Sequence, residues 1–270
     1  MYINLFDSHV HSDNSPEGRD LVTALCSAAV DKGISGICIT DACDMEEFEE
    51  QKYGKRLMYS CFAAHKAQDI FSQQLIVTNG VEMCQPLADP DRAVQVIGEN
   101  RFDFVLGSLH KTRKYGDMMM LNYAHPALDL QDVFRSYYEE LLEVVQWGHF
   151  DSLAHLGYPL RYLKPYNRTV DLAQIDDVFA EIMKSLVAQG KALELNTGGL
   201  RMEIEAFTPS NKYLQMYKDY GGEMITNGSD AECCSDIGCD IQAGLELLKS
   251  VGFKYFTVYK NRQPVMLRLL

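Results

Sequence analysis

The sequence predicts an α/β protein built as a parallel barrel of about seven β–α units. Short apolar runs of strand length alternate along the chain with stretches of helical periodicity, and serial alternation of this kind builds a parallel sheet. Polar residues stand at the ends of these apolar runs, as they do in barrels whose sites gather at the carboxyl ends of the strands. A closed barrel is therefore favoured over an open sheet. No linker, repeat or shift in composition interrupts the chain, so residues 1–270 are interpreted as one domain.

The expected strands are short apolar runs bounded by polar or turn-forming residues. They lie near residues 3–9, 36–40, 75–81, 102–109, 152–156, 192–196 and 223–227. The two clearest helices fall at 133–145 and 172–186, where apolar residues recur at spacings of three and four. Gly148 and Gly190 follow the last apolar turns of these helices, and glycine readily adopts the left-handed conformation that ends a helix.

Composition narrows the class of protein. The chain has 25 Lys and Arg against 38 Asp and Glu, a net charge of -13, and so acidic a surface disfavours nucleic-acid binding. No run of about 18 apolar residues occurs, so we expect no membrane span. The start of the sequence lacks the pattern of a signal peptide, and the eight cysteines lack paired CxxC spacing. We therefore expect a cytoplasmic protein with reduced thiols.

Residues of metal-ligand type end several of the expected strands. His9 and His11 form an H-x-H pair, and residues two apart in a strand point to the same face, so both imidazoles can reach one ion. Alone, the pair is equally compatible with polar residues on an exposed strand end. The full set at the expected barrel mouth is His9, His11, Glu82, His110, His155 and Asp230. Imidazole with carboxylate suits zinc, iron or manganese, and a carboxylate can bridge two cations.

Seven motifs extend this pattern along the chain. They are DSHVHSDNSPEG, ITDACDM, GVEM, GSLHK, AHLGYPLRY, LELNTGGLR and ITNGSDAE. Together they resemble the PHP (polymerase and histidinol phosphatase) family, and within it the histidinol-phosphatase branch. The resemblance runs from about residue 5 to residue 264. It implies a distorted (β/α)7 barrel, similar to a TIM barrel, with up to three metals at the carboxyl ends of the strands.

The resemblance also implies a ligand set. One metal would be held by His9, His11, Glu82 and Asp230, and a second by Glu82, His110 and His155. The family's third site takes ligands at positions 13, 42 and 232, which here are Asp13, Ala42 and Glu232. Alanine has no donor atom, although Asp13 and Glu232 could form a carboxylate half-site that favours manganese or magnesium. We therefore expect two divalent ions (Zn, Fe or Mn) and a third site that is weak or empty.

The activity that the resemblance implies is hydrolysis of L-histidinol phosphate to L-histidinol and phosphate, a step of histidine biosynthesis. A hydroxide bridging the metals would attack phosphorus in line. Arg161 and Arg201 would hold the phosphate, since guanidinium fits phosphate in a bidentate manner. His110 and Asp230 are the expected catalytic residues. The leaving alkoxide would be protonated by Asp230 or by a metal-bound water near Asp13 and Glu232, and the sequence does not choose between them.

Two other functions remain open at this point. The chain could be a PHP phosphoesterase for another small phosphate ester, such as a nucleotide or sugar phosphate. Alternatively, the changes at Ala42 and Glu232 could leave a metal-binding protein with weak or no catalysis. The expected partner is a small phosphorylated substrate, with no nucleic acid and no membrane. The sequence does not reveal the metals or the oligomeric state.

Overall fold

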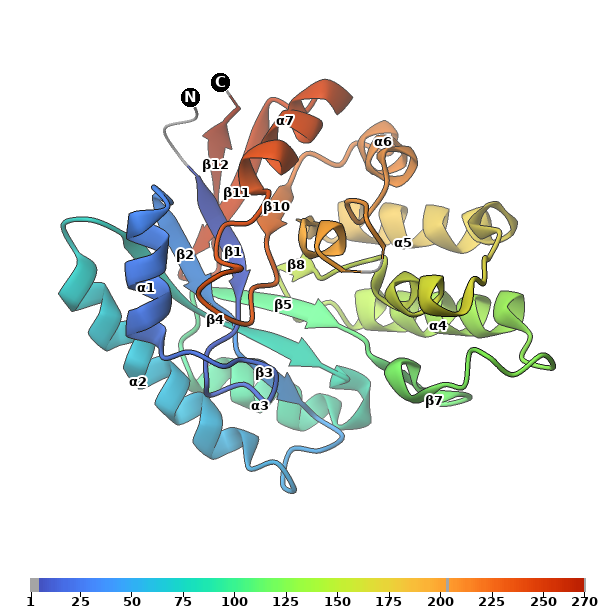
Figure 1. Ribbon diagram of the computed structural model, residues 1–270, viewed down its shortest axis with the longest axis horizontal. Coiled ribbons are helices and arrows are strands. Elements are labelled where there is room, and N and C mark those ends of the chain that lie inside the picture. Colours follow the sequence, from blue (N-terminus) through green and yellow to red (C-terminus); the bar gives the residue numbers. More distant parts are fainter. Residues whose placement is uncertain (1–4, 203, 270) are drawn as a thin grey trace.

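The computed structural model describes residues 5–202 and 204–269 (Figure 1). Parallel strands form its centre in the order β1-β2-β4-β5-β8-β9-β10. Their bounds are β1 (Phe6–Val10), β2 (Gly36–Ile39), β4 (Ile76–Cys84), β5 (Phe104–Ser108), β8 (Ser152–Leu153), β9 (Ala192–Asn196) and β10 (Ile225–Gly228). These seven strands confirm the expected series, although the run predicted at 3–9 begins outside the described residues.

The two ends of the sheet meet and nearly close the barrel. Val10, the last residue of β1, forms a parallel bridge with Ala231, which lies just past the end of β10. The His11 amide donates to the Ala231 carbonyl at 2.8 Å, and the Ala231 amide donates to the His9 carbonyl at 3.3 Å. Closure therefore occurs at the carboxyl ends of the strands, where the expected site residues lie.

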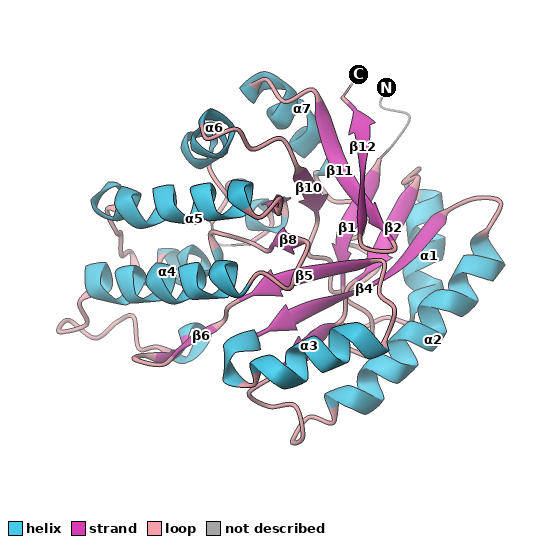
Figure 2. Cartoon of the chain, turned by 180° about the vertical axis from the view of Figure 1, so that it is seen from behind, coloured by secondary structure: helices cyan, strands magenta, loops and turns pink. Residues whose placement is uncertain are grey.

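Helices lie outside the strands (Figure 2). They are α1 (Val22–Asp31), α2 (Tyr53–Phe71), α3 (Pro90–Glu99), α4 (Leu130–Trp147), α5 (Asp176–Ala188), α6 (Asn211–Asp219) and α7 (Ile241–Val251). The helix expected at 133–145 is α4, and the one expected at 172–186 starts as a 3-10 turn (Leu172–Ile175) and continues as α5. Gly148 and Gly190 follow these helices with φ of 68° and 62°, as predicted. No helix in the described part of the chain is long and apolar enough to cross a membrane.

Additional short strands lie at the carboxyl ends of the main strands. β3 (Ala42–Asp44) pairs with the carboxyl-terminal part of β4, which is longer than the run expected at 75–81. β6 (Lys111–Thr112) and β7 (Gly116–Asp117) form a small antiparallel ribbon after β5. In contrast, β8 is only two residues long, because the chain leaves the extended conformation before His155, where φ is 21°.

A carboxyl-terminal hairpin, which the sequence did not predict, anchors the opposite end of the barrel. Its strands are β11 (Tyr255–Lys260) and β12 (Gln263–Arg268). Buried Asp103, just before β5, accepts from the Asn261 amide at 2.9 Å and from the Lys260 ammonium at 3.0 Å. The same carboxylate accepts from the Asn79 amide at 3.1 Å. Asp103 therefore joins the hairpin turn to the amino ends of the strands.

Replacing Asp103 with alanine should lower the free energy of unfolding by about 2–3 kcal/mol, because the buried Asn79 amide and the part-buried Asn261 amide lose their acceptor. Urea denaturation measures this loss. The matched control is Lys260→Met, which removes a half-exposed partner and should cost less than about 1 kcal/mol. Equal losses in the two variants would contradict the role given to the amides.

Candidate metal centre and phosphate site

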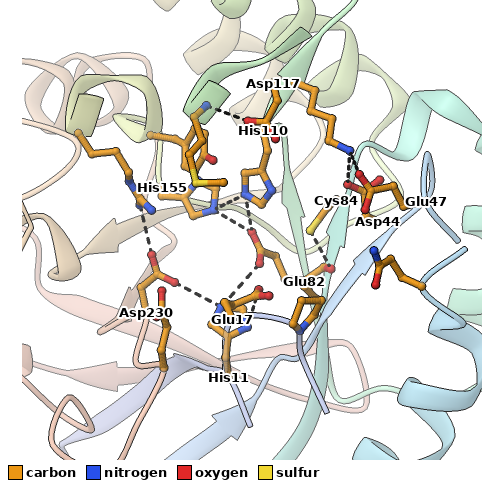
Figure 3. A pocket seen from close by; sticks show the side chains of 18 of the residues that line it. His11, Glu17, Asp44, Glu47, Glu82, Cys84, His110, Asp117, His155 and Asp230 are labelled. Atoms are coloured by element: carbon orange, nitrogen blue, oxygen red, sulfur yellow. Dashed lines mark hydrogen bonds and ion pairs between the residues drawn. The ribbon is translucent and has the colours of Figure 1, made fainter. Parts of the chain in front are cut away.

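Six side chains converge at the carboxyl ends of the strands, and all of them except the fully buried His9 line a cavity of about 290 Å³ (Figure 3). His9 lies in β1 and His11 directly follows that strand, while Glu82 lies near the end of β4. The other three stand two residues beyond β5, β8 and β10, and are His110, His155 and Asp230. All six residues that the sequence singled out as metal ligands therefore come together in space.

The first group of ligand atoms comes from β1 and the loop after β10. The Nε2 atoms of His9 and His11 lie 3.0 Å apart. Asp230 Oδ1 lies 3.5 Å from the first and 3.3 Å from the second. This trio satisfies the spacing needed to surround one metal ion.

Glu82 stands between this group and a second one. Its Oε2 lies 3.8 Å from His9 Nε2 and 3.7 Å from His11 Nε2. Its Oε1 lies 2.8 Å from His155 Nε2 and 3.3 Å from His110 Nε2. One carboxylate thus presents an oxygen to each group, which is the geometry of a bridging ligand.

The chemistry of these atoms fits divalent metals. Glu82 is buried, and burial opposes its ionisation, but hydrogen bonds from His110, His155 and His9 hold the pKa of its carboxyl well below the ordinary value. His110 and His155 also face each other through Nε2 atoms 3.4 Å apart. Imidazole nitrogens and an ionised carboxylate that share one cavity are the donor set of zinc, iron and manganese sites.

Arg161 faces the same cavity from the 3-10 turn after β8. Its guanidinium lies over the Tyr158 ring at 4.5 Å, and one Nη lies 3.4 Å from Asp230 Oδ2. Its Nε is buried and has no hydrogen-bond partner among the described residues. A buried guanidinium N–H without an acceptor is costly, so this position suits an oxyanion.

Comparison with known proteins identifies the family. The model of the PHP domain matches residues 7–198, which is more than half of the chain. The chain belongs to the PHP domain family. The histidinol-phosphatase of Lactococcus lactis is 27% identical over 260 residues, covering 94% of each chain. A probable histidinol-phosphatase of Thermotoga maritima is 28% identical and covers 94% of this chain and 95% of the relative.

A solved structure shows the same fold. Histidinol phosphate phosphatase from Lactococcus lactis, complexed with zinc, L-histidinol and phosphate, superimposes with a TM-score of 0.77. It is 24% identical in sequence, and the match covers 97% of this chain and 99% of that chain. The predicted barrel architecture is thereby confirmed.

The three residues expected at a third metal position differ in whether they face the cavity. Ala42 and Glu232 line the cavity, whereas Asp13 is exposed and does not. Glu17 lines it instead, with Oε1 3.4 Å from His11 Nδ1. The loop folds back closely there and leaves room only for glycine at residue 18, since a Cβ on Gly18 would lie 2.0 Å from the Ser12 carbonyl oxygen. In the sequence, the feature that could have drawn attention to Glu17 is its position in SPEG, the end of the first motif.

Arg201 occupies a different position from Arg161. Its Nη atoms donate to the carbonyls of Ser229 at 2.8 Å and Asp230 at 2.9 Å, and it does not line the cavity. Asp230 has a φ of 56°, a left-handed conformation that is costly for a residue other than glycine. In this geometry Arg201 stabilises the loop that presents Asp230, and its expected contact with phosphate stays a prediction.

The sequence also missed Lys111, which directly follows His110 and lines the cavity. Its ammonium lies 3.3 Å from Asp44 and 2.5 Å from Glu47, which belong to the acidic segment after β2. Lys111 therefore neutralises part of the acidic wall opposite Arg161. The GSLHK motif contains this lysine, but hydrophobic periodicity does not predict which loop its side chain contacts.

Metal binding should release protons from this site. Burial opposes protonation of His11, but Glu17 and Asp230 outweigh that effect and raise its pKa to about 9. At pH 7 the metal-free imidazole is therefore protonated, and a ligating imidazole must be neutral. Apparent metal affinity should rise about tenfold per pH unit between pH 7 and 9 for each proton displaced. Calorimetry in buffers of different ionisation enthalpy counts the protons, and a count of zero at pH 7 would contradict this expectation.

Proposed function

We propose that this PHP protein is a metal-dependent phosphomonoesterase that hydrolyses L-histidinol phosphate to L-histidinol and phosphate in histidine biosynthesis. The observation that carries the proposal is Glu82, whose two oxygens face two groups of ligand atoms, with Arg161 on the same cavity. Relatives named histidinol-phosphatase, aligned over nearly the whole chain, support the substrate.

The proposed centre holds two divalent ions. His9, His11, Glu82 and Asp230 would hold the first, and Glu82, His110 and His155 would hold the second. When bound, such ions lower the pKa of water toward neutrality and offset negative charge on the phosphoryl group. A third ion at Glu17 and Glu232 would bind weakly, because Ala42 offers no donor atom and Glu232 is paired with Arg19 at 3.2 Å.

The chain's own side chains then have distinct roles. Arg161 binds phosphoryl oxygens through its free Nε and an Nη, and this contact strengthens as negative charge develops in the transition state. Burial opposes ionisation of Asp230, but His9, His11 and Arg161 hold its carboxyl pKa well below the ordinary value. Asp230 is therefore ionised at neutral pH, and it can accept a proton from water and pass it to the leaving alkoxide. His110 is the most exposed of the imidazoles that face Glu82, and it lines the cavity. It would therefore contact the bound substrate as well as the metal.

The charge of the cavity favours a cationic leaving group. Glu17 and Glu232 line the cavity in addition to the carboxylates that pair with Lys111. L-histidinol carries an ammonium group, which these carboxylates attract, whereas a nucleotide or sugar phosphate adds no positive charge.

We also propose a cytoplasmic location, which the free state of all eight cysteines supports.

The test is phosphate release from a panel of esters, with the metal content of the same samples. Two ions per chain and a kcat/KM for L-histidinol phosphate well above that for nucleotide and sugar phosphates would support the proposal. Preference for another ester would favour the second candidate. Two bound metals without turnover on any ester would identify a catalytically silent protein, and three tightly held ions would contradict our assignment of Ala42.

A further inference from the structure

Glu194 is a fully buried carboxylate in β9 that lies behind the proposed metal ligands. Its Oε1 accepts a hydrogen bond from His9 Nδ1 at 2.7 Å. Its Oε2 accepts from the His155 amide at 2.6 Å. These two partners belong to different metal groups, so one side chain contacts ligands of both.

The contact with His9 determines which imidazole nitrogen carries the proton. An ionised carboxylate can only accept, so Nδ1 must donate to Glu194. In the neutral imidazole, Nε2 then has a free lone pair, and this is the atom that faces His11 and Asp230. A carboxylate behind a ligating histidine fixes the ring and raises its basicity in this way.

The contact with His155 replaces a missing sheet hydrogen bond. β8 ends at Leu153, and His155 has a φ of 21°, which is unusual for a residue other than glycine. Glu194 Oε2 satisfies the amide of this residue from the neighbouring strand. The unusual backbone turns His155 toward Glu82, with 2.8 Å between Nε2 and Oε1. The carboxylate therefore stabilises the conformation that directs this imidazole into the cavity.

The surroundings of Glu194 require both of its oxygens to accept. A third donor, Asn196 Nδ2, lies 3.2 Å from Oε2 and 3.4 Å from Asp230 Oδ2. A glutamine at position 194 would keep one acceptor oxygen. Its NH₂ group would then face either His9 Nδ1 or the His155 amide, both of which are donors. Space is equally restricted, because a Cβ on Gly228 would lie 2.5 Å from both Glu194 Oε1 and His9 Cβ.

We infer that Glu194 is a positioning residue that holds ligands of both metal groups in their binding geometry. The inference rests on the proposed metal centre. A carboxylate of this kind typically contributes 10- to 100-fold to metal affinity.

The experiment compares the parent protein with Glu194→Gln by chelator-competition titration of Zn²⁺ and Mn²⁺. The control is Thr226→Val. Thr226 is buried and paired with Glu194 in the sheet register, but its hydroxyl is hydrogen-bonded to that of Ser152 at 2.8 Å rather than to a proposed metal ligand. We expect metal affinity to fall about 10- to 100-fold in Glu194→Gln and less than twofold in the control. The melting temperatures of the two metal-free variants should be similar, and excess Mn²⁺ should recover kcat in Glu194→Gln.

The outcomes separate the inference from the proposed function. If the parent binds no metal, the proposed function fails. If the parent binds metal and Glu194→Gln binds it within twofold of the parent, the inference is overturned. Should Glu194→Gln fail to fold, Gly228→Ala, which displaces the same pair by steric contact, must show the same weakening of metal affinity for the inference to stand.

Discussion

Replacing Glu82 with alanine is expected to remove bound metal and turnover together. Each ion loses an anionic ligand, and the imidazoles on the two sides lose the charge that holds them 2.8–3.8 Å from one carboxylate. We expect kcat/KM to fall by at least about three orders of magnitude, equivalent to about 4 kcal/mol of transition-state stabilisation. Elemental analysis of the purified protein and phosphate release from L-histidinol phosphate measure the two losses on one sample.

A carboxylate that lines the cavity without facing both ligand groups provides the control. Glu47 is partly exposed and pairs with Lys111. Glu47→Gln should retain two ions per chain and stay within about tenfold of the parent kcat/KM, because it changes only charge on the cavity wall. Full activity in Glu82→Ala would refute the binuclear centre, whatever the control shows.

The sequence predicted the barrel because its main signals are local. The strand expected at 192–196 is β9 residue for residue, since its apolar run is bounded by a helix end and a polar turn. The hairpin of β11 and β12 was missed because its role lies in distant partners. Asp103 lies more than 150 residues before the turn it anchors, and no periodicity reveals that contact.

The site residues on strand ends were predictable from the sequence, whereas those that depend on loop conformation were not. Strand ends place His9, Glu82 and Asp230 at one mouth, so topology alone predicts that they approach one another. The choice between Asp13 and Glu17 depends on how a short loop folds back, and spacing along a strand does not extend into that loop. The double contact of Glu194 likewise depends on the backbone of His155, whose conformation is set by the fold around it.

Replacing Arg161 with alanine should lower kcat/KM by about 10²- to 10³-fold, the usual effect of removing one donor from a developing oxyanion. Among the described residues, its guanidinium is the one that faces the cavity with a free N–H. Lysine should recover little of the loss, because an ammonium lacks the planar pair of donors. The inhibition constant for inorganic phosphate should rise in both variants, while the metal content stays at the parent level.

Arg201 provides the comparison that tests this assignment. Its Nη atoms are already bonded to the carbonyls of Ser229 and Asp230, so Arg201→Met should disturb the Asp230 loop first. We expect weaker metal binding in that variant and, once metal is saturating, an inhibition constant for phosphate close to that of the parent. If the inhibition constant instead rises as much as in Arg161→Ala, Arg201 leaves these carbonyls to bind phosphate, and the role predicted from the sequence holds. The two arginines are thus distinguished by whether phosphate affinity or metal affinity changes first.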